Sequence, residues 1–162
     1  MKITATAFPA ALLLCLLLST PPAIASGLTE AAKEGEKLIS TCTVCHDADR
    51  QPPLGPPLFG VKNRYLRMYP DRDSFVAAIR EWATEPSESK ALMREPLRQF
   101  GLMPPMPLPE DMLNNIASFI FETDFPPPCA HWRTLVEEAE KSGRVDRHIQ
   151  MEKRNLERFC GN

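Results

Sequence analysis

Two cysteines and a histidine stand close together in the run Cys42-Thr43-Val44-Cys45-His46. Two thiols at this spacing can each form a thioether with one of the two vinyl groups of a haem, and the adjacent histidine can then bind the iron. The run therefore predicts one covalently attached haem c. Cys42 and Cys45 would hold the macrocycle, and His46 would be the ligand on one face of the metal.

Two other kinds of site use a C-x-x-C run. A redox-active dithiol normally opens a helix that follows a β-strand, and no strand pattern precedes Cys42. A zinc site needs a second pair of ligands, and the chain has neither a second C-x-x-C nor an H-x-x-x-H. The histidine directly after Cys45 favours haem over both.

A six-coordinate iron needs a second axial ligand, and a thioether would raise the reduction potential relative to a second imidazole. Met103 and Met106 stand out because they lie in a proline-stiffened stretch, residues 103–109, directly before a helical pattern. The other methionines can be interpreted as core residues. His131 and His148 are the alternative ligands. The methionines considered are Met68, Met93, Met103, Met106, Met112 and Met151.

The chain between the motif and the tail predicts helices separated by irregular, proline-rich connections, and no strand. We therefore expect an all-α fold. The 17 prolines favour irregular connections over a sheet or a long bundle. Helices are predicted over 29–40, from Asp73 to about Pro86 and over 110–123, with a short helical turn after Pro96 and an irregular stretch over 47–69.

The tail begins at a stiff break, Pro126-Pro127-Pro128, and contains two further helical patterns joined at Ser142-Gly143. In an antiparallel hairpin the start of the first helix meets the end of the second, where Cys129 and Cys160 stand. We predict a disulfide between them, which would stabilise the chain by about 3–4 kcal/mol. The hairpin would act as a stability clip, or alternatively as a docking surface or a cap over the haem site.

The N-terminus has the pattern of a secretory signal peptide. Lys2 precedes an apolar run from Ala10 to Leu18, and Ala23-Ile24-Ala25 offers a small-x-small cleavage site. We expect residues 1–25 to be removed and the protein to be periplasmic, with no membrane span after cleavage. A retained N-terminal anchor is the alternative.

Three parts of the chain are therefore expected: a signal peptide over 1–25, a haem domain over 26–125 and a hairpin over 126–162 closed by a disulfide. With Cys15 in the signal peptide, four of the five cysteines remain in the mature chain, and an oxidising compartment favours pairing of those outside the motif. The formal net charge of −2 gives no sign of a nucleic-acid binder.

The stretch from Thr29 to Thr123 resembles a class I (monohaem) cytochrome c of the bacterial periplasmic type. In that family a glycine-bearing first helix leads into C-x-x-C-H, as Gly35 and the Cys42–His46 run do here apart from a one-residue difference in spacing. A Gly-Pro-x-Leu-x-Gly element follows, matched by residues 55–60, and a Met-Pro loop precedes a helix. The tail after Pro126 lies outside the resemblance.

The resemblance also implies roles for single residues. The carbonyl of Pro56 would accept the imidazole N–H of His46, which fixes the ring and its basicity. Leu58 would pack on the macrocycle.

The helix after the Met-Pro loop carries an aromatic residue that crosses the first helix in this family. Phe119 fits that residue, with Gly35 as its close-contact partner. The spacing back from Phe119 favours Met103 as the sixth ligand, with Met106 as the alternative.

The resemblance implies a carrier of single electrons between periplasmic or membrane redox proteins: a dehydrogenase or quinol oxidase on one side, a terminal oxidase or reductase on the other. No residue set forms an acid–base or nucleophile constellation, so an enzyme is not expected. The alternatives are a haem-bearing small subunit of a larger periplasmic redox enzyme, and a haem enzyme or sensor with an open iron site.

Overall fold

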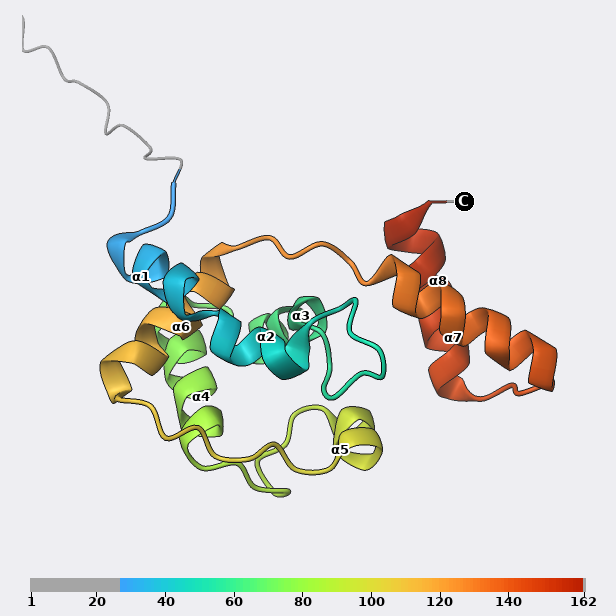
Figure 1. Ribbon diagram of the computed structural model, residues 1–162, viewed down its shortest axis with the longest axis horizontal. Helices are drawn as coiled ribbons and strands as arrows, with labels where there is room; N and C mark the ends of the chain where they lie inside the picture. The colour runs from blue at the N-terminus through green and yellow to red at the C-terminus, as the bar shows by residue number, and fades with distance from the viewer. Residues whose placement is uncertain (1–26, 162) are drawn as a thin grey trace, which may run out of the picture.

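The computed structural model describes residues 27–161, so the predicted signal peptide lies outside the described residues. Within this span the chain forms α-helices and no strand, which confirms the all-α prediction (Figure 1). None of the described helices has the length and apolar composition that crossing a bilayer requires. The helices are α1 (Glu30–Leu38), α2 (Ser40–His46), α3 (Leu58–Met68), α4 (Arg72–Thr84), α5 (Arg94–Phe100), α6 (Glu110–Glu122), α7 (Cys129–Ser142) and α8 (Arg147–Cys160).

The helix predicted over 29–40 corresponds to α1, and a second helix that was not predicted, α2, follows it through the motif. Thr29 caps α1, because its hydroxyl accepts the Ala32 N–H at 3.3 Å. Ile39 ends α1 and also precedes α2, and its carbonyl accepts the amides of Cys42 and Thr43 at 2.9 and 3.0 Å. The break at Ile39 lets the chain continue in helical form through the whole C-x-x-C-H run.

Helix α3 lies inside the stretch that we predicted to be irregular, and for this part the prediction was wrong. Pro57 precedes the helix, where a missing N–H costs nothing, and its carbonyl accepts the amides of Gly60 and Val61. Leu58 and Tyr65 are buried on one face of α3. The prolines of residues 52–57 hid a helix that starts directly behind them.

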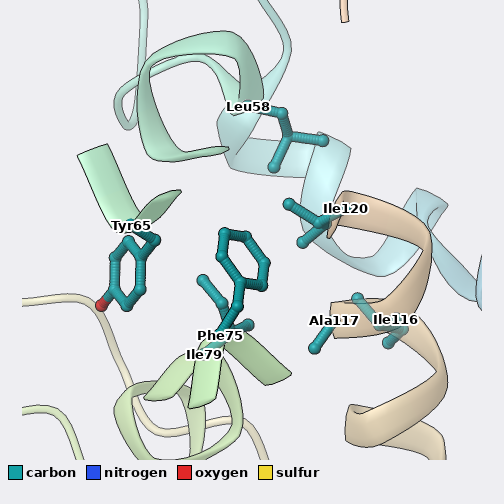
Figure 2. Close-up of a cluster of buried hydrophobic side chains, with 7 residues drawn as sticks. All are labelled: Leu58, Tyr65, Phe75, Ile79, Ile116, Ala117 and Ile120. Carbon is teal, nitrogen blue, oxygen red and sulfur yellow. The ribbon is translucent and has the colours of Figure 1, made fainter. Parts of the chain in front are cut away.

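The core lies between α3, α4 and α6 (Figure 2). Asp71 caps α4 by accepting the Ser74 amide at 2.9 Å. Phe75 of α4 has no exposed surface and makes an edge-to-face contact with Phe121 of α6 at a centroid distance of 5.3 Å. The buried cluster consists of Leu58, Tyr65, Phe75, Ile79, Ile116, Ala117 and Ile120.

Helices α1 and α6 pack backbone against backbone at Gly35. A Cβ added there would lie 2.0 Å from the carbonyl oxygen of Asn115 and 2.9 Å from the amide nitrogen of Ile116. The closest neighbours of Gly35 lie one turn before Phe119, the residue that we expected to contact it. Phe119 is buried and pairs with Phe125 at 6.0 Å.

One carboxylate ties the ends of α1, α4 and α6 together. Glu122 at the end of α6 accepts the backbone N–H and the hydroxyl of Thr29, both at 2.8 Å, and pairs with Arg72 at 3.3 Å. Burial alone would raise the pKa of Glu122, but these partners outweigh it and hold the pKa below its ordinary value.

Helices α7 and α8 form the predicted antiparallel hairpin, set at one end of the molecule and joined to α6 by an extended segment (Figure 1). The turn between them depends on Gly143, whose φ of +68° lies in the left-handed region. The Arg144 amide closes the turn by donating a hydrogen bond to the Ala139 carbonyl at 2.9 Å.

We predict that Gly35→Ala destabilises the fold by more than about 3 kcal/mol, because the new methyl group meets backbone that cannot move aside. Denaturant unfolding of the two proteins measures the difference. Gly27→Ala is the matched control, since nothing lies within 4 Å of a Cβ at Gly27. Equal stability of Gly35→Ala and the parent would contradict the packing described for α1 and α6.

We predict that Glu122→Gln lowers stability at pH 7 by about 1–2 kcal/mol, since hydrogen bonds to a charged acceptor are lost. A carboxyl group whose pKa is lower in the folded state stabilises the fold above its unfolded pKa. That contribution is lost as the pH falls through the folded pKa. The difference between the two proteins should therefore shrink on acidification below about pH 4.5, measured by denaturant unfolding across a pH series. A difference that stays constant with pH would contradict the assignment.

Candidate functional site

Helix α2 places the two motif cysteines on one face. Cys42 and Cys45 are three positions apart, so their side chains lie above one another on the helix. Both are half-buried free thiols that line the same cavity. Val44 between them is 59% exposed, on the opposite face. Burial, followed by the neighbouring Cys45, raises the pKa of the Cys42 thiol.

His46 ends α2, and a hydrogen bond orients its ring. The Nδ1 atom lies 2.6 Å from the carbonyl oxygen of Pro56. A carbonyl can only accept, so Nδ1 carries the proton and Nε2 keeps its lone pair. Burial lowers the pKa of His46, although the bond to Pro56 opposes the shift. The result is a neutral imidazole with one nitrogen free to bind a metal.

Gly55 lets the chain pass close to this ring. A Cβ at Gly55 would lie 3.3 Å from both Cε1 and Nδ1 of His46. The 55–56 backbone therefore covers the Nδ1 edge of the imidazole, and Nε2 is on the other edge. His46 itself lines the cavity, as does Leu58, which is 5% exposed.

The cavity is almost wholly apolar and has a volume of about 200 Å³. Helix α2 supplies one wall, and Trp82, Ile79 and Leu113 supply others from α4 and α6. Among the described residues, His46 is the one histidine that lines the cavity, and no Asp, Glu, Lys or Arg side chain lines it.

Both predicted axial methionines line this cavity. Met103 and Met106 line the cavity from the segment that joins α5 to α6, which is drawn apart from α2 in Figure 1. Its backbone is fixed where the Met106 amide donates to the Ala83 carbonyl of α4 at 2.8 Å. Both side chains are half-buried. The structure therefore brings the motif and the methionine segment to one cavity.

Sequence reasoning missed one wall of the cavity. Met93, Leu97 and Phe100 line it from α5 and the residue before it. The segment is held to α3 by Arg64, whose Nε donates to the Leu92 carbonyl at 2.9 Å. These residues are spaced by four and then three positions, as on one face of a helix, and this spacing could have indicated the missing wall in the sequence.

The two histidines of the tail do not reach the cavity. His131 and His148 lie in α7 and α8 and are absent from the cavity lining. The Nδ1 atom of His148 lies 3.5 Å from a carboxylate oxygen of the buried Glu152. As axial ligands they would need the hairpin to move, which leaves the methionines as the candidates at hand.

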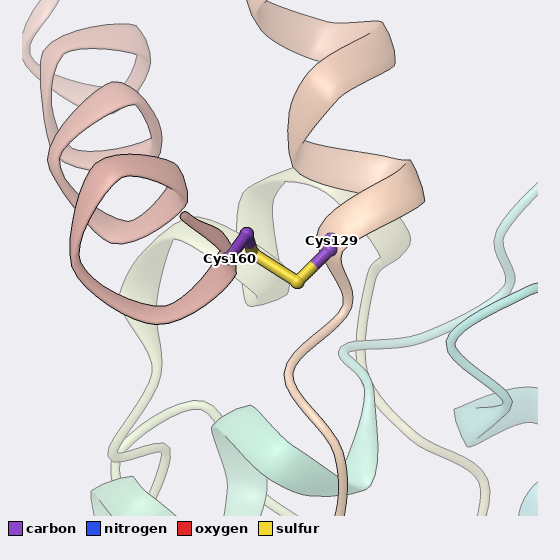
Figure 3. The surroundings of a disulfide bond; sticks show 2 residues. All are labelled: Cys129 and Cys160. Carbon is purple, nitrogen blue, oxygen red and sulfur yellow. A yellow bond between two sulfur atoms is a disulfide. The ribbon is translucent and has the colours of Figure 1, made fainter. Parts of the chain in front are cut away.

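The remaining two cysteines form the disulfide that the hairpin pattern predicts. Cys129 and Cys160 are joined with an S–S distance of 2.09 Å and a Cα–Cα distance of 5.7 Å. Figure 3 shows the bond linking the start of α7 to the end of α8. The four described cysteines are thus divided between one crosslink and one pair of free thiols.

The residues present fit a covalently held haem on three counts. Two free thiols share a helix face, a neutral imidazole lies beside them with Nε2 unused, and the adjoining cavity is apolar. Within residues 27–161, no group of three His, Cys, Asp or Glu residues is placed to hold a metal ion.

Comparisons with known proteins gave no match. None of the family models, curated proteins or solved structures that were searched matches this chain. The functional conclusion therefore depends on the motif and on the geometry of the cavity.

Proposed function

We propose that this protein is a monohaem c-type cytochrome that carries single electrons between periplasmic or membrane redox proteins. One observation carries the proposal: the free thiols of Cys42 and Cys45, the oriented imidazole of His46 and the methionines 103 and 106 all line one apolar cavity. Haem c is the group whose chemistry needs all of these parts. The sequence resemblance to class I cytochromes c points the same way.

The chain's own residues would do three things for the bound group. Cys42 and Cys45 would tether it, so that a small domain need not hold it by packing alone. His46 would present Nε2 to the iron, while the Pro56 carbonyl holds the proton on Nδ1 and keeps the ring oriented. Leu58 and the other apolar walls would exclude water from the macrocycle.

A bound haem supplies a one-electron change between ferric and ferrous iron. The apolar walls favour the ferrous state because they disfavour the extra positive charge of ferric iron. A thioether from Met103, or alternatively Met106, would favour it further. An electron carrier needs no acid–base group at the metal, and no titratable side chain of the described residues other than His46, Cys42, Cys45 and Tyr65 lines the cavity.

The alternative of a small subunit in a larger redox enzyme also has an observation in its favour. Arg147, Arg154 and Arg158 lie along one face of α8, together with Met151, at spacings of three and four residues. All four are exposed, and none of the arginines pairs with a carboxylate of the described residues. Such a face suits docking to an acidic protein surface.

We predict that replacing Cys42 and Cys45 together by Ala leaves no haem on a denaturing gel stained for haem peroxidase activity. Without thioethers, the group would be lost when the protein unfolds. Cys129→Ala with Cys160→Ala is the matched control and should keep the stain, because those residues bind each other. A haem band that persists in the Cys42/Cys45 variant would overturn the proposal.

We predict that Met103→Ala abolishes the weak charge-transfer band that Met–Fe(III) ligation gives near the red edge of the visible spectrum. Met103 is preferred because of its spacing to Phe119, and loss of the sulfur should also lower the reduction potential. Met106→Ala should keep the band. Met68→Ala is the control, since Met68 is 50% exposed and outside the cavity lining.

The reverse result, with the band lost only in Met106→Ala, would transfer the ligand to Met106 and leave the carrier function standing. If neither substitution changes the band, the sixth ligand is neither residue. Absence of the band already in the parent protein would favour an iron with an open site.

A further inference from the structure

A cluster of three aromatic rings joins the hairpin to α3. Phe59 of α3 makes edge-to-face contacts with Trp132 of α7 and Phe159 of α8, at centroid distances of 5.7 and 5.4 Å. Trp132 and Phe159 also face each other at 6.1 Å. Each ring therefore touches the other two, and the cluster spans three helices.

The disulfide stands next to both hairpin rings. Cys129 is one helical turn before Trp132, and Cys160 directly follows Phe159. Crosslinking these two cysteines fixes the ends of α7 and α8 from which the two rings project. The crosslink thus holds the pair of rings as one unit, with Phe59 against it.

Phe59 in turn is close along the chain to the residues that orient His46. It lies in the first turn of α3, three residues after Pro56 and next to Leu58. The Pro57 carbonyl accepts the amides of Gly60 at 2.8 Å and Val61 at 3.1 Å, so Phe59 lies inside a hydrogen-bonded turn. Two prolines directly before this turn leave little freedom for the Pro56 carbonyl to move independently of it.

The chain segment that precedes Pro56 has little support from the rest of the fold. Residues 50–55 make no hydrogen bond to another element in the described part of the chain. The position of the Pro56 oxygen on His46 therefore depends on α3, and the start of α3 is packed against the hairpin.

We propose that the disulfide-closed hairpin is a clamp on the haem site, and that Phe59 is a positioning residue through which it acts. Trp132 and Phe159 hold Phe59, Phe59 holds the first turn of α3, and that turn keeps the Pro56 carbonyl on the Nδ1–H of His46. The inference rests on the proposed function, since it assigns the hairpin a role in setting the reduction potential.

The direction of the effect follows from the hydrogen bond. A carbonyl that accepts the Nδ1 proton makes the imidazole a stronger donor, which stabilises the ferric state. Loosening the clamp weakens that bond and should favour the ferrous state. Water entry alone would have the opposite effect, because water stabilises the more highly charged ferric iron.

The test is the reduction potential of the haem-loaded full-length protein, measured by spectroelectrochemistry in Phe59→Ala, Trp132→Ala and the double variant. We expect each single variant to shift the ferrous-to-ferric ratio at fixed potential about threefold toward ferrous, equivalent to a rise of about 30 mV at 59 mV per tenfold change. The double variant should match the singles rather than their sum, since both changes break one contact. Cys129→Ser with Cys160→Ser should shift the potential in the same direction.

Two variants serve as controls. Val145→Ala changes an apolar side chain of the hairpin that is 79% exposed and is not part of the cluster, so the potential should not move. Trp132→Phe keeps a ring against Phe59 and should retain the parent potential. If Phe59→Ala fails to fold, the comparison of Trp132→Ala with Trp132→Phe still decides the test.

Amide hydrogen exchange gives a second measurement. Exchange at Gly60 and Val61, whose amides bond to Pro57, should accelerate in Trp132→Ala and stay slow in Val145→Ala. Unchanged potentials in folded Phe59→Ala and Trp132→Ala, or a fall instead of a rise, would overturn the clamp while the haem stain keeps the carrier function standing. A parent protein without covalent haem would overturn both.

Discussion

The close approach of α1 and α6 at Gly35 is the contact on which the arrangement of the cavity depends. Only Ile39 separates the end of α1 from helix α2, which carries the two thiols and His46. The methionine segment ends where α6 begins. The crossing of α1 and α6 therefore sets the distance between the two walls that carry the candidate ligands. A bulkier residue at position 35 would separate the helices and, with them, both halves of the site.

The parts of the fold that sequence could predict are those whose signals are local. The helix over 110–122, the turn at Gly143 and the disulfide between Cys129 and Cys160 each follow from spacing within a short stretch or from one pairing. The motif at residues 42–46 is equally local. Helix α3 escaped prediction because the prolines before Leu58 indicate irregular chain, although a proline directly before a helix is well tolerated.

The contacts between the hairpin of α7 and α8 and the rest of the fold could not be predicted from local patterns. Phe59 contacts Trp132 and Phe159 only because three helices meet there. The residue pattern of one helix does not indicate which residues of the other two it will contact. The same holds for Glu122, whose partners Thr29 and Arg72 come from two distant helices. The closest approach at Gly35 is likewise made by a distant segment, the backbone of Asn115 in α6.

The division of the cysteines has a kinetic consequence. Thiol–disulfide exchange proceeds by attack of a thiolate, so a thiol with a raised pKa and little exposed surface attacks slowly at neutral pH. Burial raises the pKa of Cys42, and Cys45 beside it is half-buried as well. Once the chain has folded, the same apolar wall that would receive the macrocycle slows reshuffling between the motif thiols and the Cys129–Cys160 bond. If haem is attached as proposed, the order of folding and attachment would then matter less, because the two sulfur pairs are kept from exchanging partners in the interval.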